Sequence, residues 1–157
     1  MADEKKLKNA QSVYKTLCDT LDARNWKYEK TPDELVVEFK VTGEDLPMDF
    51  LVAVDVEREL IRLMSRMPFA FSAEKRFDGA IVTCHANYRM CDGSFDYDIE
   101  SGRIFFRMTS SFRDSLISQE LFNYMIDCSC AMVDYYNDKF LMVDKGILSV
   151  VDFFKLK

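Results

Sequence analysis

The stretch FDYDIESGRIFFRM, residues 95–108, decides the fold class. Its first half alternates apolar and acidic residues, so that Phe95, Tyr97 and Ile99 share one face of a strand. Ser101 and Gly102 provide a tight turn, and residues 103–108 return as a second strand. The stretch therefore predicts an antiparallel hairpin with one buried face and one solvated face.

Four further strands are predicted upstream of this hairpin. Trp26 and Tyr28 alternate with charged residues, and residues 35–41 and 48–56 show the same two-residue period. Turns are expected at residues 31–34 and 43–45, where Pro and Gly lie. Residues 60–67 suit either a helix or a strand. We expect a strand that pairs with the preceding one and ends before Pro68.

Three helices are predicted from apolar residues at spacings of three and four. They cover residues 4–21, residues 72–90 and a long segment that follows Ser118, a suitable N-cap, and runs past Phe140. The order helix, four strands, helix, two strands, helix predicts an α+β fold, an antiparallel sheet with helices packed on it. In the middle helix the apolar stripe is expected to consist of Phe77, Ala80, Ile81, Cys84 and Tyr88.

The apolar stripe of the last helix is wider than a helix with one buried face requires. A stripe from Phe122 to Val143 is broadened by a second set from Leu121 to Tyr135, so we expect burial against the sheet and against a partner. The apolar tail, residues 147–154, is expected to dock on its own domain or on a second chain. Nine methionines supply adaptable apolar surface, although most are expected to fill the core. The candidate partner-binding residues are Met125, Met132, Tyr135, Tyr136 and Phe140.

Composition bounds the function. The 157 residues suit a single domain, 1–157, with one core, and 48% of them are hydrophobic. A formal net charge of -6 disfavours binding to nucleic acid or to anionic membranes, because both need clustered Lys and Arg. Residues 1–8 are charged and lack the apolar core of a signal peptide, and most of the five cysteines lie in apolar segments. A reducing, bacterial-type cytoplasm is therefore expected.

The sequence contains none of the common catalytic or metal motifs. It has no nucleophile elbow, no HExxH motif and no glycine loop for phosphate. His85 adjoins Cys84, but Cys91 would lie about 10.5 Å further along a continuous helix, too far to share one metal ion with Cys84. The acidic residues of the hairpin do not match a calcium loop and are expected to form a solvated face opposite Arg103 and Arg107. We expect no metal, no cofactor and no enzymatic activity.

A run of residues in and around the hairpin carries a family resemblance. It comprises Asn87 … Gly93-Ser94-Phe95-Asp96-Tyr97-Asp98 … Gly102-Arg103-Ile104-Phe105-Phe106-Arg107, preceded by Met67-Pro68-Phe69 and followed by Ser118-Gln119-Glu120 and Asp134-Tyr135-Tyr136. In this run the chain resembles the YbjN-like family over roughly residues 21–146. The family is similar in fold to the type III secretion chaperones, which are small, acidic, mostly dimeric α+β proteins. The resemblance implies that fold, a binding or chaperone-like role and no catalytic residues.

The motif also has a physical interpretation. Gly93 and Gly102 are expected to serve turns, and Arg107 to pair with a carboxylate of the hairpin. Phe95, Ile104 and Phe106 are core candidates.

The leading hypothesis is a non-enzymatic, cytoplasmic, homodimeric protein that binds a polypeptide, as a client or as a regulatory partner, through an apolar sheet or helix surface. The alternative is a small-molecule-binding protein or weak enzyme with a pocket between sheet and helices. An open apolar groove favours the first hypothesis, and a closed pocket with converging polar groups favours the second.

Overall fold

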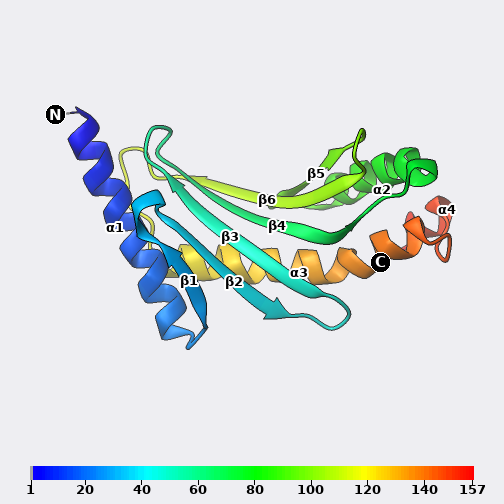
Figure 1. The fold of residues 1–157 in the computed structure, drawn as a ribbon, viewed down its shortest axis with the longest axis horizontal. Helices are drawn as coiled ribbons and strands as arrows, with labels where there is room; N and C mark the ends of the chain where they lie inside the picture. Colours follow the sequence, from blue (N-terminus) through cyan, green and yellow to red (C-terminus); the bar gives the residue numbers. More distant parts are fainter. Residues whose placement is uncertain (1) are drawn as a thin grey trace.

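Six strands form one antiparallel sheet in the computed structural model, which describes residues 2–157 (Figure 1). Met1, part of the charged segment noted above, lies outside the described residues. The spatial order is β1-β2-β3-β4-β6-β5. This confirms the predicted α+β class and the antiparallel sheet. The strands are β1 (Tyr28–Thr31), β2 (Val36–Thr42), β3 (Pro47–Asp55), β4 (Leu60–Ala70), β5 (Ser94–Asp98) and β6 (Arg103–Ser111).

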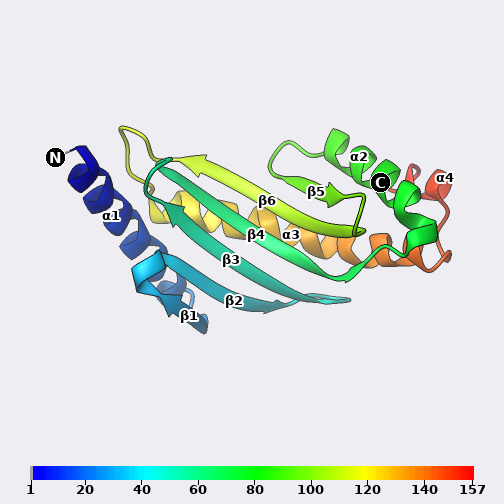
Figure 2. The ribbon, with the colours of Figure 1, turned by 45° about the horizontal axis from the view of Figure 1, so that its top comes forward.

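The helices cover one face and both ends of this sheet. They are α1 (Ala2–Ala23), α2 (Arg76–Arg89), α3 (Gln119–Asp144) and the short α4 (Val150–Phe153), with 3-10 turns η1 (Pro32–Glu34) and η2 (Ala73–Lys75). In Figures 1 and 2, α3 runs along the back of the sheet, α1 lies at the β1 end, and α2 and α4 gather at the opposite end. Within residues 2–157, no helix is both long and apolar enough to cross a membrane.

A cluster of aromatic rings joins the hairpin to the last two helices. The centroid of the Phe95 ring lies 5.3 Å from that of Phe106 and 5.0 Å from that of Phe140. Phe140 in turn stacks on Phe153 of α4 at 5.6 Å. All four side chains are at most 2% exposed, and burying each contributes about 1.5–3 kcal/mol. The apolar tail thus docks on its own chain through Phe153.

Two glycines of the family motif make close approaches that exclude a side chain. Gly102 has φ +73°, its carbonyl accepts a hydrogen bond from the Phe71 N–H at 2.8 Å, and a Cβ there would lie 2.2 Å from the Phe71 carbonyl oxygen. Gly93 has φ +75°, and its Cβ would lie 2.4 Å from Cζ of Phe106. The predicted turn roles of both residues are confirmed, and packing as well as backbone conformation requires them.

Several local predictions are confirmed, and one needs correction. The ambiguous segment is a strand, β4, paired with β3 as expected. Ser118 caps α3, since its hydroxyl accepts a hydrogen bond from the Leu121 N–H at 3.1 Å. Pro68, however, does not end β4. It lies where the pairing with β6 shifts register between Arg66 and Ala70, an irregularity that removes the need for a proline N–H in the ladder.

The predicted orientation of α2 is wrong. Of the expected apolar stripe, Phe77, Ile81, Cys84 and Tyr88 are exposed to solvent. The buried face of α2 consists of the small or short residues Gly79, Val82, Thr83 and Ala86. The reason is close approach. A Cβ on Gly79 would lie 2.5 Å from the Tyr97 hydroxyl and 2.8 Å from Cγ of Phe71, so the helix meets its neighbours on its small-residue side.

Replacing Phe95 tests the aromatic cluster. We expect Phe95→Ala to lower the free energy of unfolding by about 3–5 kcal/mol, because it leaves a cavity among the rings of Phe106, Tyr136 and Phe140. Urea unfolding followed by circular dichroism measures the loss. Phe154→Ala is the control, since this ring is 42% exposed, and its loss is expected to be about 1 kcal/mol. Equal losses in the two variants would contradict the assignment of the core.

Candidate functional site

The sheet face opposite α3 is not covered by any helix of residues 2–157, and we call it the open face (Figure 2). Strand register places one row of side chains straight across it. Glu38 of β2 is the partner of Leu51 on β3, Leu51 of Met64 on β4, and Met64 of Arg107 on β6. Leu51 and Met64 are only partly buried. The row therefore has two apolar side chains between Glu38 and Arg107, and it continues to Glu29 on β1 and Ser94 on β5.

The next row carries alternating charges. Lys40 faces Asp49, Asp49 faces Arg66, and Arg66 faces Phe105. The Lys40–Asp49 pair is 3.8 Å long and well exposed, so it adds little stability. These charges are available to orient a bound molecule.

The ion pair predicted within the hairpin is present beside this row. Arg107 donates from Nε and Nη2 to the two carboxylate oxygens of Asp96, at 2.6 and 3.0 Å. A bidentate pair of this kind holds the planar guanidinium in one orientation. The expectation that Arg107 pairs with a carboxylate of the hairpin is confirmed.

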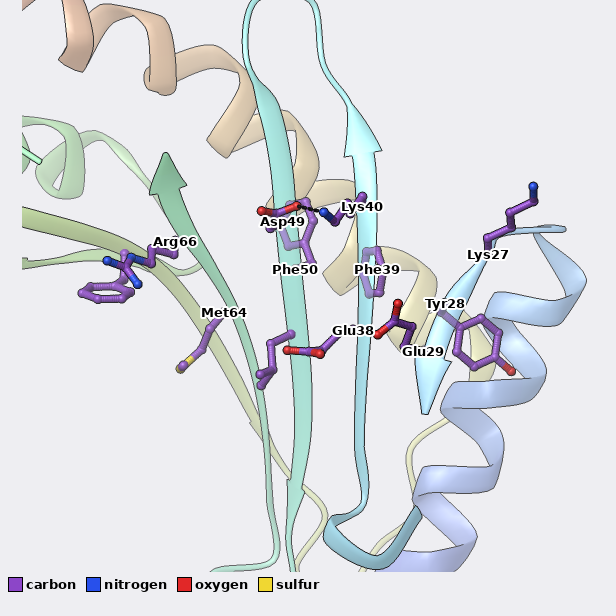
Figure 3. Close-up of a pocket in the computed structure, with 12 residues that line it drawn as sticks. Lys27, Tyr28, Glu29, Glu38, Phe39, Lys40, Asp49, Phe50, Met64 and Arg66 are labelled. Atoms are coloured by element: carbon purple, nitrogen blue, oxygen red, sulfur yellow. Dashed lines mark ion pairs between the residues drawn. The ribbon is translucent and has the colours of Figure 1, made fainter. Parts of the chain in front are cut away.

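A depression of about 870 Å³ occupies the β1–β4 side of the open face (Figure 3). It is a concavity of the twisted sheet rather than an enclosed cavity, with Leu51 and Met64 among its lining residues. We call it the sheet depression. The residues that line it are Lys27, Tyr28, Glu29, Glu38, Phe39, Lys40, Asp49, Phe50, Leu51, Met64, Arg66 and Phe105.

The sheet depression is lined by groups that can take part in binding. Its lining includes carboxylates and cations but no His, Cys, Ser or Thr side chain. Burial and a hydrogen bond to the Asp22 carboxylate raise the pKa of Tyr28, so its phenol stays protonated near neutral pH. A protonated phenol is neither a base nor a nucleophile. The depression offers apolar contact, hydrogen bonds and charge.

The cysteines and His85 all lie outside the lining of the sheet depression. Burial raises the pKa of the Cys18 and Cys128 thiols and raises that of Cys130 to about 12, so these three are not thiolates at neutral pH. The His85 ring lies at the edge of α2, with its centroid 4.6 Å from that of Phe154. Among the residues described, no three His, Cys, Asp or Glu side chains are grouped so as to hold a metal ion.

The five candidate partner-binding residues of α3 do not form one exposed surface in the structure. Met125, Tyr136 and Phe140 are buried in the core of their own chain, where Tyr136 and Phe140 belong to the aromatic cluster. Met132 and Tyr135 are partly buried. Of the five candidates, only Met132 and Tyr135 remain accessible for outside contact. Partner binding at the α3 residues stays a prediction.

Asn87 has a role that the sequence analysis did not assign. Its side chain donates to the Phe95 carbonyl at 2.9 Å and accepts from the Phe95 N–H at 2.7 Å. Because β5 is the last strand of the sheet, this amide takes the place of a further strand. Exposed strand edges invite pairing with other chains, and Asn87 blocks that pairing at Phe95. The only signal in the sequence was the presence of Asn87 in the family motif.

Removing the Asn87 amide tests this role. We expect Asn87→Ala to cost about 1–3 kcal/mol of unfolding free energy and to speed hydrogen exchange at the Phe95 amide, because two backbone groups lose their partner. Exchange measured by NMR reports on that amide directly. Asn9→Ala on α1 serves as the control and should leave Phe95 protected. If the Phe95 amide exchanged as slowly in the Asn87 variant as in the wild type, the Asn87 side chain would not be what protects it.

Comparison with known proteins places this geometry in a family. The model of the YbjN family, described as "Putative bacterial sensory transduction regulator", matches residues 14–142. A solved structure described as "Crystal structure of YbjN, a putative transcription regulator from E. coli" has a TM-score of 0.58 and 10% sequence identity. The match covers 79% of this chain and 87% of that one. At this identity the likeness shows the fold alone. A search of curated proteins found no match.

The family match spans all six strands, α2 and nearly all of α3. It therefore includes the open face, the hairpin motif and the hydrogen bonds between the Asn87 side chain and the Phe95 backbone. The chain belongs to the YbjN family.

Proposed function

We propose that this chain is a non-enzymatic regulatory module that binds a polypeptide partner on its open face. The observation that carries the proposal is the apolar pair Leu51 and Met64, which lies uncovered in a depression bordered by charges of both signs. The description of the family as sensory transduction regulators supports a role in regulation. A regulator that acts by binding needs an adaptable surface and no catalytic group.

The composition of the open face suits an amphipathic segment of a protein. Leu51, Met64 and Phe105 supply apolar area, and the flexible thioether of Met64 adapts to different side chains. The alternating Lys40, Asp49 and Arg66 would orient a segment that carries its own charges. This is a chaperone-like mode of binding, in which the apolar contacts accept side chains of different shapes and the charges set the orientation of the bound segment.

Face binding is favoured over addition of a strand at the hairpin end of the sheet. The outer edge of β5 is occupied at Phe95 by the Asn87 side chain. A partner strand would have to displace two hydrogen bonds there before it gained any of its own.

The small-molecule alternative receives less support. That hypothesis placed a pocket between the sheet and the helices, where Phe95, Phe106 and Phe140 pack together. The sheet depression lies on the other face, is open, and has its charges spread along strands rather than converging on a point. An open surface of this kind suits an extended ligand better than a compact one.

The proposal extends to the setting of the protein. We propose that residues 1–157 act as one domain, as a homodimer in the cytoplasm, on proteins rather than on nucleic acid or membranes. The net charge of -6 supports a preference for proteins over nucleic acid and anionic membranes, and so does the alternation of cations with acids on the open face, which provides no continuous basic strip for phosphates.

A charge placed in the apolar row tests the open face. Selection from a random 12-residue peptide display library is expected to enrich peptides that alternate apolar and charged residues. Met64→Lys is expected to weaken binding of a selected peptide at least about tenfold, because it puts a charge where an apolar contact forms. Fluorescence anisotropy of the labelled peptide measures the change.

Thr109→Lys is the matched control, since Thr109 is an exposed residue of β6 outside the sheet depression. It should bind the peptide as the wild type does. Equal binding by wild type and Met64→Lys would exclude the sheet depression as the binding site.

A further inference from the structure

Three arginines surround Met64 on the open face. Arg62 and Arg66 lie two residues before and two residues after Met64 on β4, and because side chains alternate along a strand, all three point to the same face. Arg107 is the partner of Met64 on β6. The apolar side chain at the centre of the open face therefore has a cation on three sides. We call Arg62, Met64 and Arg66 the β4 row.

The three arginines differ in their partners. Arg107 is neutralised by its bidentate pair with Asp96. Arg62 instead lies between Ala53 on β3 and Thr109 on β6, and it forms no ion pair within residues 2–157. Its Nε–H is buried and donates to no acceptor, whereas buried donors in folded proteins usually have one. A carboxylate bound at Arg62 would neutralise this charge.

Arg66 is also left without an acid. It is exposed, and although Asp49 is its partner on β3, the two side chains form no ion pair. The Asp49 carboxylate lies 3.8 Å from the Lys40 ammonium on its other side, and Figure 3 shows it turned toward Lys40. Arg66 is therefore available to a carboxylate from another molecule.

The acidic residues of the open face lie on the side away from the β4 row. Glu29 of β1 and Glu38 of β2 are direct cross-strand partners, an arrangement in which like charges repel. Three strand spacings, about 14 Å, separate β1 from β4, which exceeds the screening length of about 8–10 Å in physiological salt. The glutamates therefore repel an acidic ligand from their own side without neutralising the arginines. The charge near β4 is locally positive, although the net charge of the chain is -6.

The spacing of the β4 row sets the pattern of a matching ligand. At about 3.4 Å per residue, the Cα atoms of Arg62 and Arg66 are about 13 Å apart, with Met64 midway. An extended segment that lies over β4 and roughly along it has the same rise per residue. Three of its side chains, each two residues apart, would then face the row in the order carboxylate, apolar group, carboxylate. In a helix, which rises 1.5 Å per residue, about nine residues would separate the two carboxylates.

We propose that the β4 row recognises an extended segment of a partner protein with the pattern acidic–x–apolar–x–acidic. One carboxylate pairs with Arg62 and the other with Arg66, since guanidinium groups bind carboxylates by two parallel hydrogen bonds. The apolar side chain packs on Met64 and Leu51. This inference rests on the polypeptide binding of the proposed function. It extends the site past the sheet depression, because Arg62 is not among the residues that line it.

Three labelled 12-residue peptides, capped at both ends and identical except at two positions, test the pattern. Their centres are Glu-Ser-Leu-Ser-Glu, Gln-Ser-Leu-Ser-Gln and Lys-Ser-Leu-Ser-Lys, between Gly-Ser flanks. In about 0.1 M NaCl the Glu peptide is expected to bind at least about tenfold more tightly than the Gln peptide, and the Lys peptide is expected to bind most weakly. Fluorescence anisotropy at protein concentrations up to about 1 mM measures the dissociation constants.

Paired substitutions test the two arginines. Arg62→Glu with Arg66→Glu is expected to invert the order, so that the Lys peptide binds most tightly. Arg62→Gln with Arg66→Gln should bind all three peptides within about threefold of one another. Arg58→Glu with Arg113→Glu makes the same change of net charge as the first pair at two exposed arginines outside the sheet depression, and it should keep the wild-type order. Circular dichroism checks that each variant keeps the wild-type fold.

Equal binding of the three peptides by the wild type, or tightest binding of the Lys peptide, would overturn the inference. So would a wild-type order in the variant with glutamate at both arginine positions. A single-stranded 12-nucleotide DNA that displaced the Glu peptide at lower concentration than the unlabelled peptide does would assign the arginines to nucleic acid instead.

The failure of this inference and that of the proposed function are distinguishable. If none of the three peptides binds, but a library-selected peptide binds and Met64→Lys weakens it, the acidic pattern is wrong and the proposed function stands. If Met64→Lys leaves the selected peptide bound as tightly as the wild type does, the proposed function fails as well.

Discussion

The Phe95 ring is the contact on which the rest of this structure depends. It joins β5 to Phe106 on β6 and to Phe140 on α3, and Phe140 passes the contact on to Phe153 of α4. The backbone of the same residue is held by Asn87 of α2. One position therefore fixes the hairpin against three helices. Because aromatic rings in a close-packed core leave little room for rearrangement, the placement of α2, α3 and α4 follows from it.

This arrangement leaves two surfaces without a partner in the chain. α3 covers only one face of the sheet, so the other face, with Leu51 and Met64 at its centre, stays open. α2 approaches the hairpin through Gly79, where a Cβ would collide with Tyr97 and Phe71, and so must turn its larger side chains outward. Both surfaces are consequences of close packing elsewhere.

The family motif belongs to the fold rather than to a reactive site. Gly93 lies so close to Phe106, and Gly102 so close to the Phe71 backbone, that neither position has room for a side chain. Arg107 forms a bidentate ion pair with Asp96. Asn87 closes a sheet edge. Residues that are needed to build a binding surface need not touch the ligand, and here the motif builds the hairpin while the sheet depression is lined mainly from β1 to β4.

The sequence by itself determined the elements, because local periodicity is a property of neighbouring residues. Two-residue alternation identified most of the strands, while β4 was assigned from its expected pairing with β3; the stripe of α3 identified its buried face, and the glycines marked their turns. The tertiary structure decided which sides of the elements meet. Small residues contribute little to a hydrophobic pattern, yet in α2 the small residue Gly79 sets how closely the helix approaches Tyr97 and Phe71. The stripe that contains Phe77 and Tyr88 was therefore expected to be buried, but it is exposed. The sequence likewise did not decide the place of Met125 and Phe140, because apolar side chains suit a core and an interface equally. Burial of a side chain is decided by the shape of what packs against it, and that shape is assembled from residues far apart in the chain.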